Sequence, residues 1–201
     1  MQEIFPELGL VRENCIEASW IQSTLFSNQM LIDQLDALLN RTQPGLRQLK
    51  AKSDYVRTPL PLNVIEDMVS MLREPDADET NYCMVPYGGI MEEISELETL
   101  FPHRTGALYK LVGLTYWQDL EAGDTDRYIS WSRRYYEYMT PYVSSSPKEA
   151  YFNYRDLDHG VNNVVGDTSY EQASIWGKPY YKDNFDRLVR VKTVVDPGNR
   201  V

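Results

Sequence analysis

The apolar segment ALYKLVGLTYW, residues 107–117, constrains the fold more than any other part of the sequence. It is much shorter than the roughly 18 apolar residues of a membrane-spanning helix, and its β-forming residues predict a strand. Ile16, Ala18 and Trp20 alternate with other positions, which predicts a strand over residues 15–27. Further strands are predicted over residues 49–57 and 82–85. We therefore expect a β-sheet.

Amphipathic helices supply a second layer. In residues 62–73, Val64, Met68 and Leu72 lie on one helical stripe, which predicts a helix that covers the sheet. Other predicted helices are residues 30–39, 125–142 (capped by Asp124), 170–176 and 184–195, the last with Val195 among its inward residues. These elements predict the α+β class, with an antiparallel β-sheet and helices packed mainly on one face. The length of 201 residues is enough for one core, so a single domain over residues 1–201 is expected.

Charge excludes some classes of partner. The net charge of -10 disfavours nucleic acid, because a phosphate-binding surface needs basic residues. No apolar run is long enough to span a membrane. The start, MQEIFPELGL, has neither a basic nor an apolar region of the kind found in signal peptides, so no signal peptide is expected there.

Metal chemistry is not expected either. Cys15 and Cys83 are the only cysteines, and His103 and His159 have no partners at metal-ligand spacing. The sequence also has no nucleophile motif typical of hydrolases. We therefore predict no metal and no hydrolytic site.

The segment AYFNYRDLDHG, residues 150–160, concentrates the side chains that could carry chemistry. Tyr151, Phe152 and Tyr154 favour an extended segment. A tyrosine near a cation can act as a base, because a positive neighbour stabilises phenolate, and Lys110 and Arg155 are the available cations. The alternative is a tyrosine-rich strand whose hydroxyl groups and Arg–Asp pairs only satisfy one another.

This segment, together with PYGGIMEEI, FPHRTGALYK and IWGKPYYKDNFDRLVRVKTVVDPGN, resembles the C-terminal half of the berberine bridge enzyme-like flavoproteins of plants. The resemblance runs over about residues 5–199, and residues 147–201 correspond to the berberine-bridge-like C-terminal motif region. It implies the substrate domain of the vanillyl-alcohol-oxidase-type fold, with FAD as cofactor and a separate FAD-binding domain as partner. The family includes cannabinoid synthases and oxidases of monolignols and carbohydrates.

The resemblance also implies roles for individual residues. Tyr154 would take a hydroxyl proton from a small-molecule substrate while hydride leaves for the flavin. Lys110 matches a lysine that assists a base tyrosine in the monolignol-oxidising members, and that tyrosine would lie before residue 1. Tyr151 and Asn153 match positions that contact the isoalloxazine ring. Strand alternation separates Tyr154 from these two residues, so we predict that the strand ends or bulges near Tyr154. Positions expected to contact substrate are Val85, Tyr87 in a turn whose glycines leave room for ligands, and Val112.

Departures from the family leave the substrate open. Cannabinoid synthases have glutamate in place of Lys110 and tyrosine in place of Val85, and monolignol-type members have glutamine in place of Val112. A phenolic or allylic alcohol, or a carbohydrate hydroxyl, is the expected substrate class.

Two hypotheses follow, because the FAD domain that precedes this region in the family is missing. Either the chain acts as part of an FAD-dependent oxidoreductase when joined to that domain, or it is a catalytically silent remnant or binding domain. The family is secreted to the cell wall or vacuole, and Asn40-Arg41-Thr42 is a glycosylation sequon that agrees with this habit.

Overall fold

The computed structural model describes residues 2–28, 30–41, 47–118 and 124–197. The chain divides into two compact units, residues 1–46 and residues 47–201. The expectation of a single domain over the whole chain stays a prediction.

The first unit has a short α-helix, α1 (Trp20–Ser27), and short 3-10 turns. The strand predicted over residues 15–27 is therefore wrong. Ser19 Oγ accepts a hydrogen bond from the Gln22 backbone, while Gln22 Oε1 accepts one from the Ser19 backbone. This reciprocal cap starts a helix in spite of the alternating apolar residues before it. The helix predicted over residues 30–39 forms only as a 3-10 helix, Leu35–Leu39.

The second unit is built on an antiparallel sheet. Within the described residues, three strands pair in the order β1-β3-β2: β1 (Gln48–Val56), β2 (Thr80–Pro86) and β3 (Tyr109–Trp117). The apolar segment singled out in the sequence is thus the central strand. Its register pairs Lys110 with Tyr55 of β1 and with Val85 of β2.

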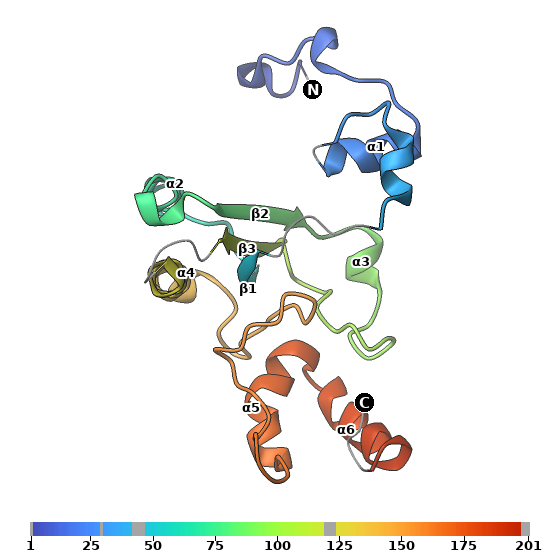
Figure 1. The fold of residues 1–201 in the computed structure, drawn as a ribbon, viewed down its shortest axis with the longest axis vertical. Coiled ribbons are helices and arrows are strands. Elements are labelled where there is room, and N and C mark those ends of the chain that lie inside the picture. Colours follow the sequence, from blue (N-terminus) through green and yellow to red (C-terminus); the bar gives the residue numbers. More distant parts are fainter. Residues whose placement is uncertain (1, 29, 42–46, 119–123, 198–201) are drawn as a thin grey trace. The chain divides into compact units, whose positions relative to one another are not determined.

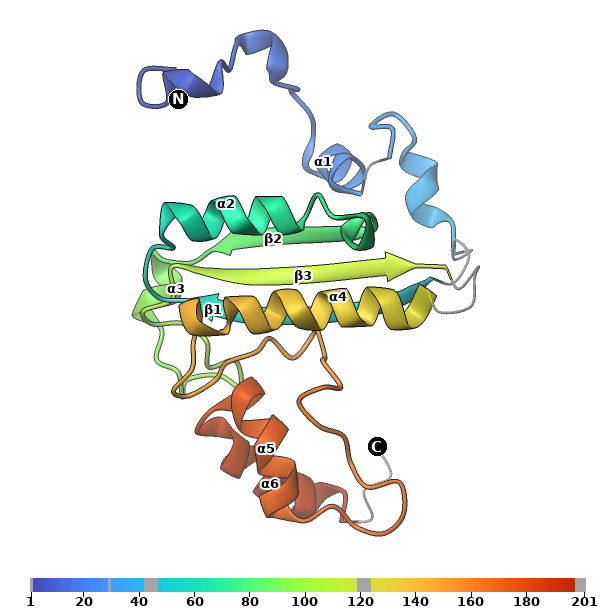
Figure 2. The same cartoon turned by 90° about the vertical axis from the view of Figure 1, so that its left-hand side faces the viewer.

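Helices α2 (Leu62–Met71) and α4 (Asp124–Met139) lie on one side of this sheet, and α3 (Ile90–Glu93) with the long loops lies on the other (Figure 1; Figure 2). We call these sides the helix face and the loop face. Apolar side chains of both helices bury Val56 and Leu111 on the helix face. The core there consists of Val56, Val64, Met68, Ala77, Leu111, Trp131, Tyr135, Met139 and Val143. The predicted α+β architecture, with helices mainly on one face, is confirmed.

Two C-terminal helices, α5 (Tyr170–Tyr181) and α6 (Asn184–Val195), pack side by side (Figure 1). Helix α5 runs further than predicted and contains Pro179, and α6 has the predicted bounds. Val195 is 77% exposed, so its predicted inward position is wrong. Asp124 is the first residue of α4 rather than a residue before it. Across the described ranges, no helix has the length and apolar character needed to cross a membrane.

Candidate active site

The loop face carries the side chains of a cross-strand row. Directly paired residues of antiparallel strands point to the same face, so Tyr55, Lys110 and Val85 share it. Val112 follows two positions after Lys110 and faces the same way. The expected catalytic lysine and two expected substrate residues therefore lie on one surface.

Lys110 is almost fully buried, with 6% of its surface exposed. Its Nζ lies 3.7 Å from the centroid of the Tyr151 ring and 5.2 Å from that of Tyr154. Burial lowers the pKa of this ammonium from its usual value, and no carboxylate of the described residues forms an ion pair with it. The lysine does not extend to water; it rests on the negative faces of two aromatic rings.

Residues 151–154 form a turn, so the extended segment predicted there is wrong. The Tyr154 amide donates to the Tyr151 carbonyl over 3.0 Å, and the two rings lie 5.4 Å apart. Asn153 Nδ2 donates to the Tyr151 hydroxyl over 2.9 Å. The turn removes the alternation that would have separated these side chains. Tyr151, Asn153, Tyr154 and Lys110 thus form one cluster, and their roles at a common cavity stay a prediction.

The other expected substrate residues lie close to this cluster. The Tyr87 ring contacts Tyr55, the partner of Lys110, at 5.7 Å. Val112 is buried and pairs with Ser53, whose hydroxyl accepts a hydrogen bond from the Tyr151 amide over 2.8 Å. Val85 is 38% exposed and open to a ligand.

Gly88 and Gly89 follow Tyr87 with φ angles of +123° and +53°, and a Cβ on either would meet no atom within 4 Å. The space beside both glycines is open, so the absence of a side chain is not what makes room for a ligand in this structure. Glycine is required there because L side chains rarely adopt these backbone angles.

An ion cluster that the sequence analysis missed fixes the end of the turn. Asp156 is 2% exposed and accepts from Lys50 over 2.5 Å and from Lys52 over 2.6 Å. Asp158 pairs with both lysines and with Arg133. Although burial raises the pKa of Asp156, the two ammonium groups outweigh burial and bring it below its usual value. These contacts tie the loop to edge strand β1 across the helix face.

A second buried carboxylate precedes the turn. Glu149 has no exposed surface, and its carboxylate binds Arg57 at 2.7 Å and Lys182 at 2.9 Å. His103 Nδ1 lies 3.7 Å away, and the His103 ring stacks on Tyr55. Burial raises the pKa of Glu149, but its neighbours dominate and bring it to about 2. The aromatic turn is therefore held between two charge-neutralised carboxylates.

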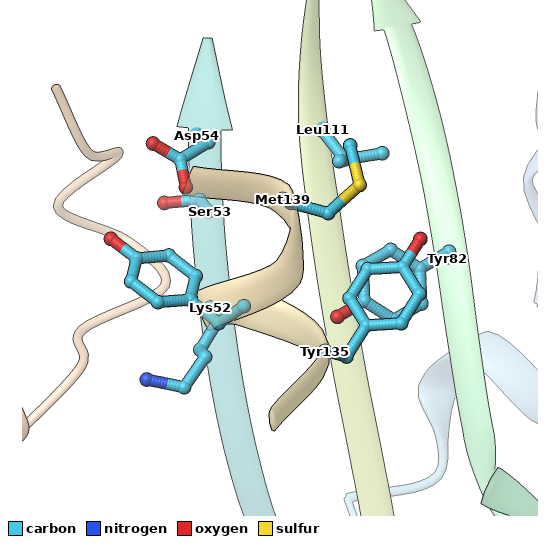
Figure 3. Close-up of a pocket in the computed structure, with 8 residues that line it drawn as sticks. Lys52, Ser53, Asp54, Tyr82, Leu111, Tyr135 and Met139 are labelled. Carbon is cyan, nitrogen blue, oxygen red and sulfur yellow. The ribbon is translucent and has the colours of Figure 1, made fainter. Parts of the chain in front are cut away.

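A cavity of about 10 Å³ lies on the helix face, between the sheet and α4 (Figure 3). Its volume is that of about one water molecule, which excludes a substrate. Tyr135 and Tyr136 line it, and their hydroxyl groups have no hydrogen-bond partner within the described ranges. This cavity is separate from the cluster around Lys110.

Two further expectations can be located. Asn40 is exposed, as glycosylation requires, but Thr42 of its sequon lies outside the described residues. In the part of the chain that the structure describes, no group of three or more His, Cys, Asp or Glu could hold a metal ion.

Comparisons with known proteins agree on one family. The family model described as "Berberine and berberine like" matches residues 150–200. Tetrahydroberberine oxidase of Berberis wilsoniae is 45% identical, over 99% of this chain and 38% of its own length. The solved structure of berberine bridge enzyme-like 28 from Arabidopsis thaliana superposes with a TM-score of 0.90 at 42% identity, over 98% of this chain and 41% of that one. Phl p 4, a grass pollen allergen with glucose dehydrogenase activity, gives a TM-score of 0.90 at 40% identity, over 99% and 40%.

By its likeness to these solved structures, the chain has the fold of the non-FAD part of a flavoprotein. More particularly, it belongs to the berberine bridge enzyme-like family of plant FAD-linked oxidoreductases, whose C-terminal part it resembles. The chain spans about two fifths of the length of the relatives it matches, and the FAD domain is not within it.

Tyr151 and Asn153 are the residues that could form one wall of a flavin site. Exposed Asn153 and half-buried Tyr151 offer an amide and an aromatic face on the loop face, which suit a flat heteroaromatic ring. The remaining walls would come from the FAD domain.

Proposed function

We propose that this chain forms the substrate side of an FAD-dependent oxidoreductase that oxidises an alcohol or phenolic substrate. The observation that carries the proposal is the ammonium of Lys110 placed over the rings of both Tyr151 and Tyr154 on the loop face. A buried cation without a carboxylate partner is costly, and packing alone gives no reason to keep it between two tyrosines. When bound, FAD supplies the hydride acceptor.

In this proposal Tyr154 takes the hydroxyl proton of the substrate. The Lys110 ammonium, 5.2 Å from the Tyr154 ring, stabilises the phenolate form of Tyr154, which is the form that can accept this proton and become the neutral phenol. Tyr151 and Asn153 bind the isoalloxazine ring, and Val85 and Tyr87 border the substrate, whereas Val112 is too deeply buried to contact it. Lys110 thus acts through charge, whereas Tyr154 moves the proton.

The substrate class rests on the side chains of the loop face and on the relatives. Half-buried Tyr87 and exposed Val85 suit the planar apolar body of a phenolic or allylic alcohol. Relatives include a tetrahydroberberine oxidase and an allergen with glucose dehydrogenase activity, so a carbohydrate hydroxyl is the alternative substrate.

The test is a chimera in which residues 1–201 replace the matching part of Arabidopsis berberine bridge enzyme-like 28. It should reduce bound flavin with an allylic alcohol, and Tyr154→Phe should lower kcat about 10²- to 10⁴-fold, the usual contribution of a general base. Tyr142→Phe is the matched control, since Tyr142 packs at the end of α4 and should leave kcat unchanged. A folded, flavin-loaded chimera without any reduction would support the silent binding domain instead.

We also propose that the protein reaches the cell wall or vacuole and carries a glycan on Asn40. Its exposure supports modification. Expression in a plant secretory system should add a glycan mass that Asn40→Gln removes, and an unchanged mass in both proteins would contradict this.

A further inference from the structure

Lys182 combines a strained backbone with a buried charge. Its φ and ψ angles are 49° and -129°, and it is the sole non-glycine residue at positive φ among the described residues. Such a conformation is strained for a residue with a side chain and persists only where the surroundings enforce it. Strained residues of this kind collect at sites where geometry must be fixed.

The Lys182 ammonium explains what enforces this conformation. It lies 2.9 Å from Glu149 Oε1 and also binds the Glu96 carboxylate, while the lysine side chain is only 12% exposed. The strained residue ends α5 and turns its ammonium toward Glu149. Because Glu149 is fully buried, leaving its carboxylate without a cation would be costly.

Glu149 lies two residues before Tyr151, so fixing its position also limits where the backbone of the aromatic turn can lie. Three successive amides are held from outside the segment: Glu149 donates to Ser144 Oγ, Ala150 to the Pro179 carbonyl of α5, and Tyr151 to Ser53 Oγ. The ring of Tyr151 then covers Lys110 at 3.7 Å. A second path runs through side chains, because His103, next to Glu149, contacts Phe101 and Phe101 contacts Tyr151.

We propose that Lys182 is a positioning residue that, through Glu149, holds Tyr151 and Tyr154 over Lys110. The catalytic importance of this geometry rests on the proposed function. The positioning of the two tyrosines by Lys182 does not, and it can be measured without flavin.

The test is the acylation rate of Lys110 in the 201-residue chain, measured by trace labelling with acetic anhydride and peptide mass spectrometry against N-acetyl-lysine in the same tube. In the parent, the tyrosine rings shield Lys110. Lys182→Gly relieves the backbone strain but removes the ammonium, so we expect a native far-UV spectrum and about a tenfold faster labelling of Lys110, because local opening of the turn becomes easier.

The matched control is Lys178→Gly. It removes the same charge and places a glycine in α5, but Lys178 is exposed, and among the described residues its ammonium forms no ion pair with Glu149. Labelling of Lys110 should then stay within about twofold of the parent rate, because a glycine at an exposed helix position has only a modest effect on stability. An equal rise in both variants, or no rise in Lys182→Gly, overturns the proposal.

If Lys182→Gly does not fold, Glu149→Gln provides the same measurement, and an unchanged Lys110 rate in that variant overturns the proposal. Tyr154→Phe separates this device from the proposed function. It removes the proton acceptor but keeps the ring, so shielding of Lys110 persists whether or not Tyr154 proves to be the base.

Discussion

The two faces of the sheet differ in how their buried side chains are stabilised. On the helix face, apolar side chains of α2 and α4 bury Leu111 and Val56 in a continuous core. On the loop face, a buried ammonium lies on tyrosine rings, and Val85 stays 38% exposed. Hydrophobic burial accounts for the first face.

Buried charges lie on both faces, but those of Lys50, Lys52 and Asp156 on the helix face are paired with one another. The Lys110 ammonium of the loop face has no carboxylate partner among the described residues and rests on aromatic rings instead, and we take this difference as the mark of a site rather than of a core.

The largest expected effect on stability concerns the ion cluster in which Asp156, just after the aromatic turn, pairs with Lys50 and Lys52 of β1. Asp156→Asn leaves the ammonium groups of Lys50 and Lys52, 11% and 4% exposed, with only Asp158 as partner. Removing one partner of a buried ion pair costs about 3–5 kcal/mol, and about 4 kcal/mol is expected in urea denaturation. Glu137→Gln, an exposed position on α4, should change stability by less than about 0.5 kcal/mol. A loss of less than about 1 kcal/mol for Asp156→Asn would show that the ion cluster contributes little to the stability of the fold.

The next prediction compares the faces directly. Leu111→Ala removes a side chain that is 4% exposed in the helix-face core and should cost about 3 kcal/mol. Val85→Ala on the loop face should cost less than about 0.5 kcal/mol, because exposed substitutions have small effects. Urea midpoints at constant m-value test both. Equal losses would break the distinction between a packed face and a binding face.

A smaller effect depends on pH. Burial raises the pKa of Asp54 to about 7, against the attraction of Lys148. The unfolded carboxyl ionises near its usual pKa of 3.8, so the folded state holds its proton to higher pH. Stability from this group is therefore full below the unfolded pKa and is lost as pH rises toward about 7.

Asp54→Asn removes this dependence. Between pH 5 and pH 7 the parent should lose on the order of 2 kcal/mol relative to the variant. Glu149, with a pKa of about 2, acts in the opposite direction and only at lower pH, so the two windows separate. A difference between parent and variant that stays constant with pH would contradict a raised pKa for Asp54.

Much of this comparison was predictable from the sequence. The apolar stripe over Val64 and Met68 gave α2, and β-forming runs gave β1, β2 and β3, because local periodicity reports burial on one face. Helix α1 was missed because the alternation of Ile16 and Ala18 concealed the cap formed by Ser19 and Gln22. A capping signal just before an apolar run would have indicated a helix.

The sequence predicts which residues are candidates for the site, but it does not predict how they are arranged. Tyr151, Tyr154 and Lys110 were chosen by type and resemblance, and the structure places them together. The turn was not predicted, because aromatic residues favour strands and distant contacts override that preference. The Lys50–Asp156 pair joins positions 106 residues apart, a separation at which local sequence carries no signal.

The central claim is that the loop face, and not the helix face, completes a flavin site with the FAD domain. The measurement that tests it most directly is flavin absorbance after gel filtration of this chain mixed with the separately produced FAD domain of a relative. The chain and its Val69→Asp variant, altered at a 42% exposed position of α2, should co-elute with bound flavin. Val85→Asp, altered at a 38% exposed position of the loop face, should not. Flavin retained equally by all three proteins, or by none of them, would contradict the account.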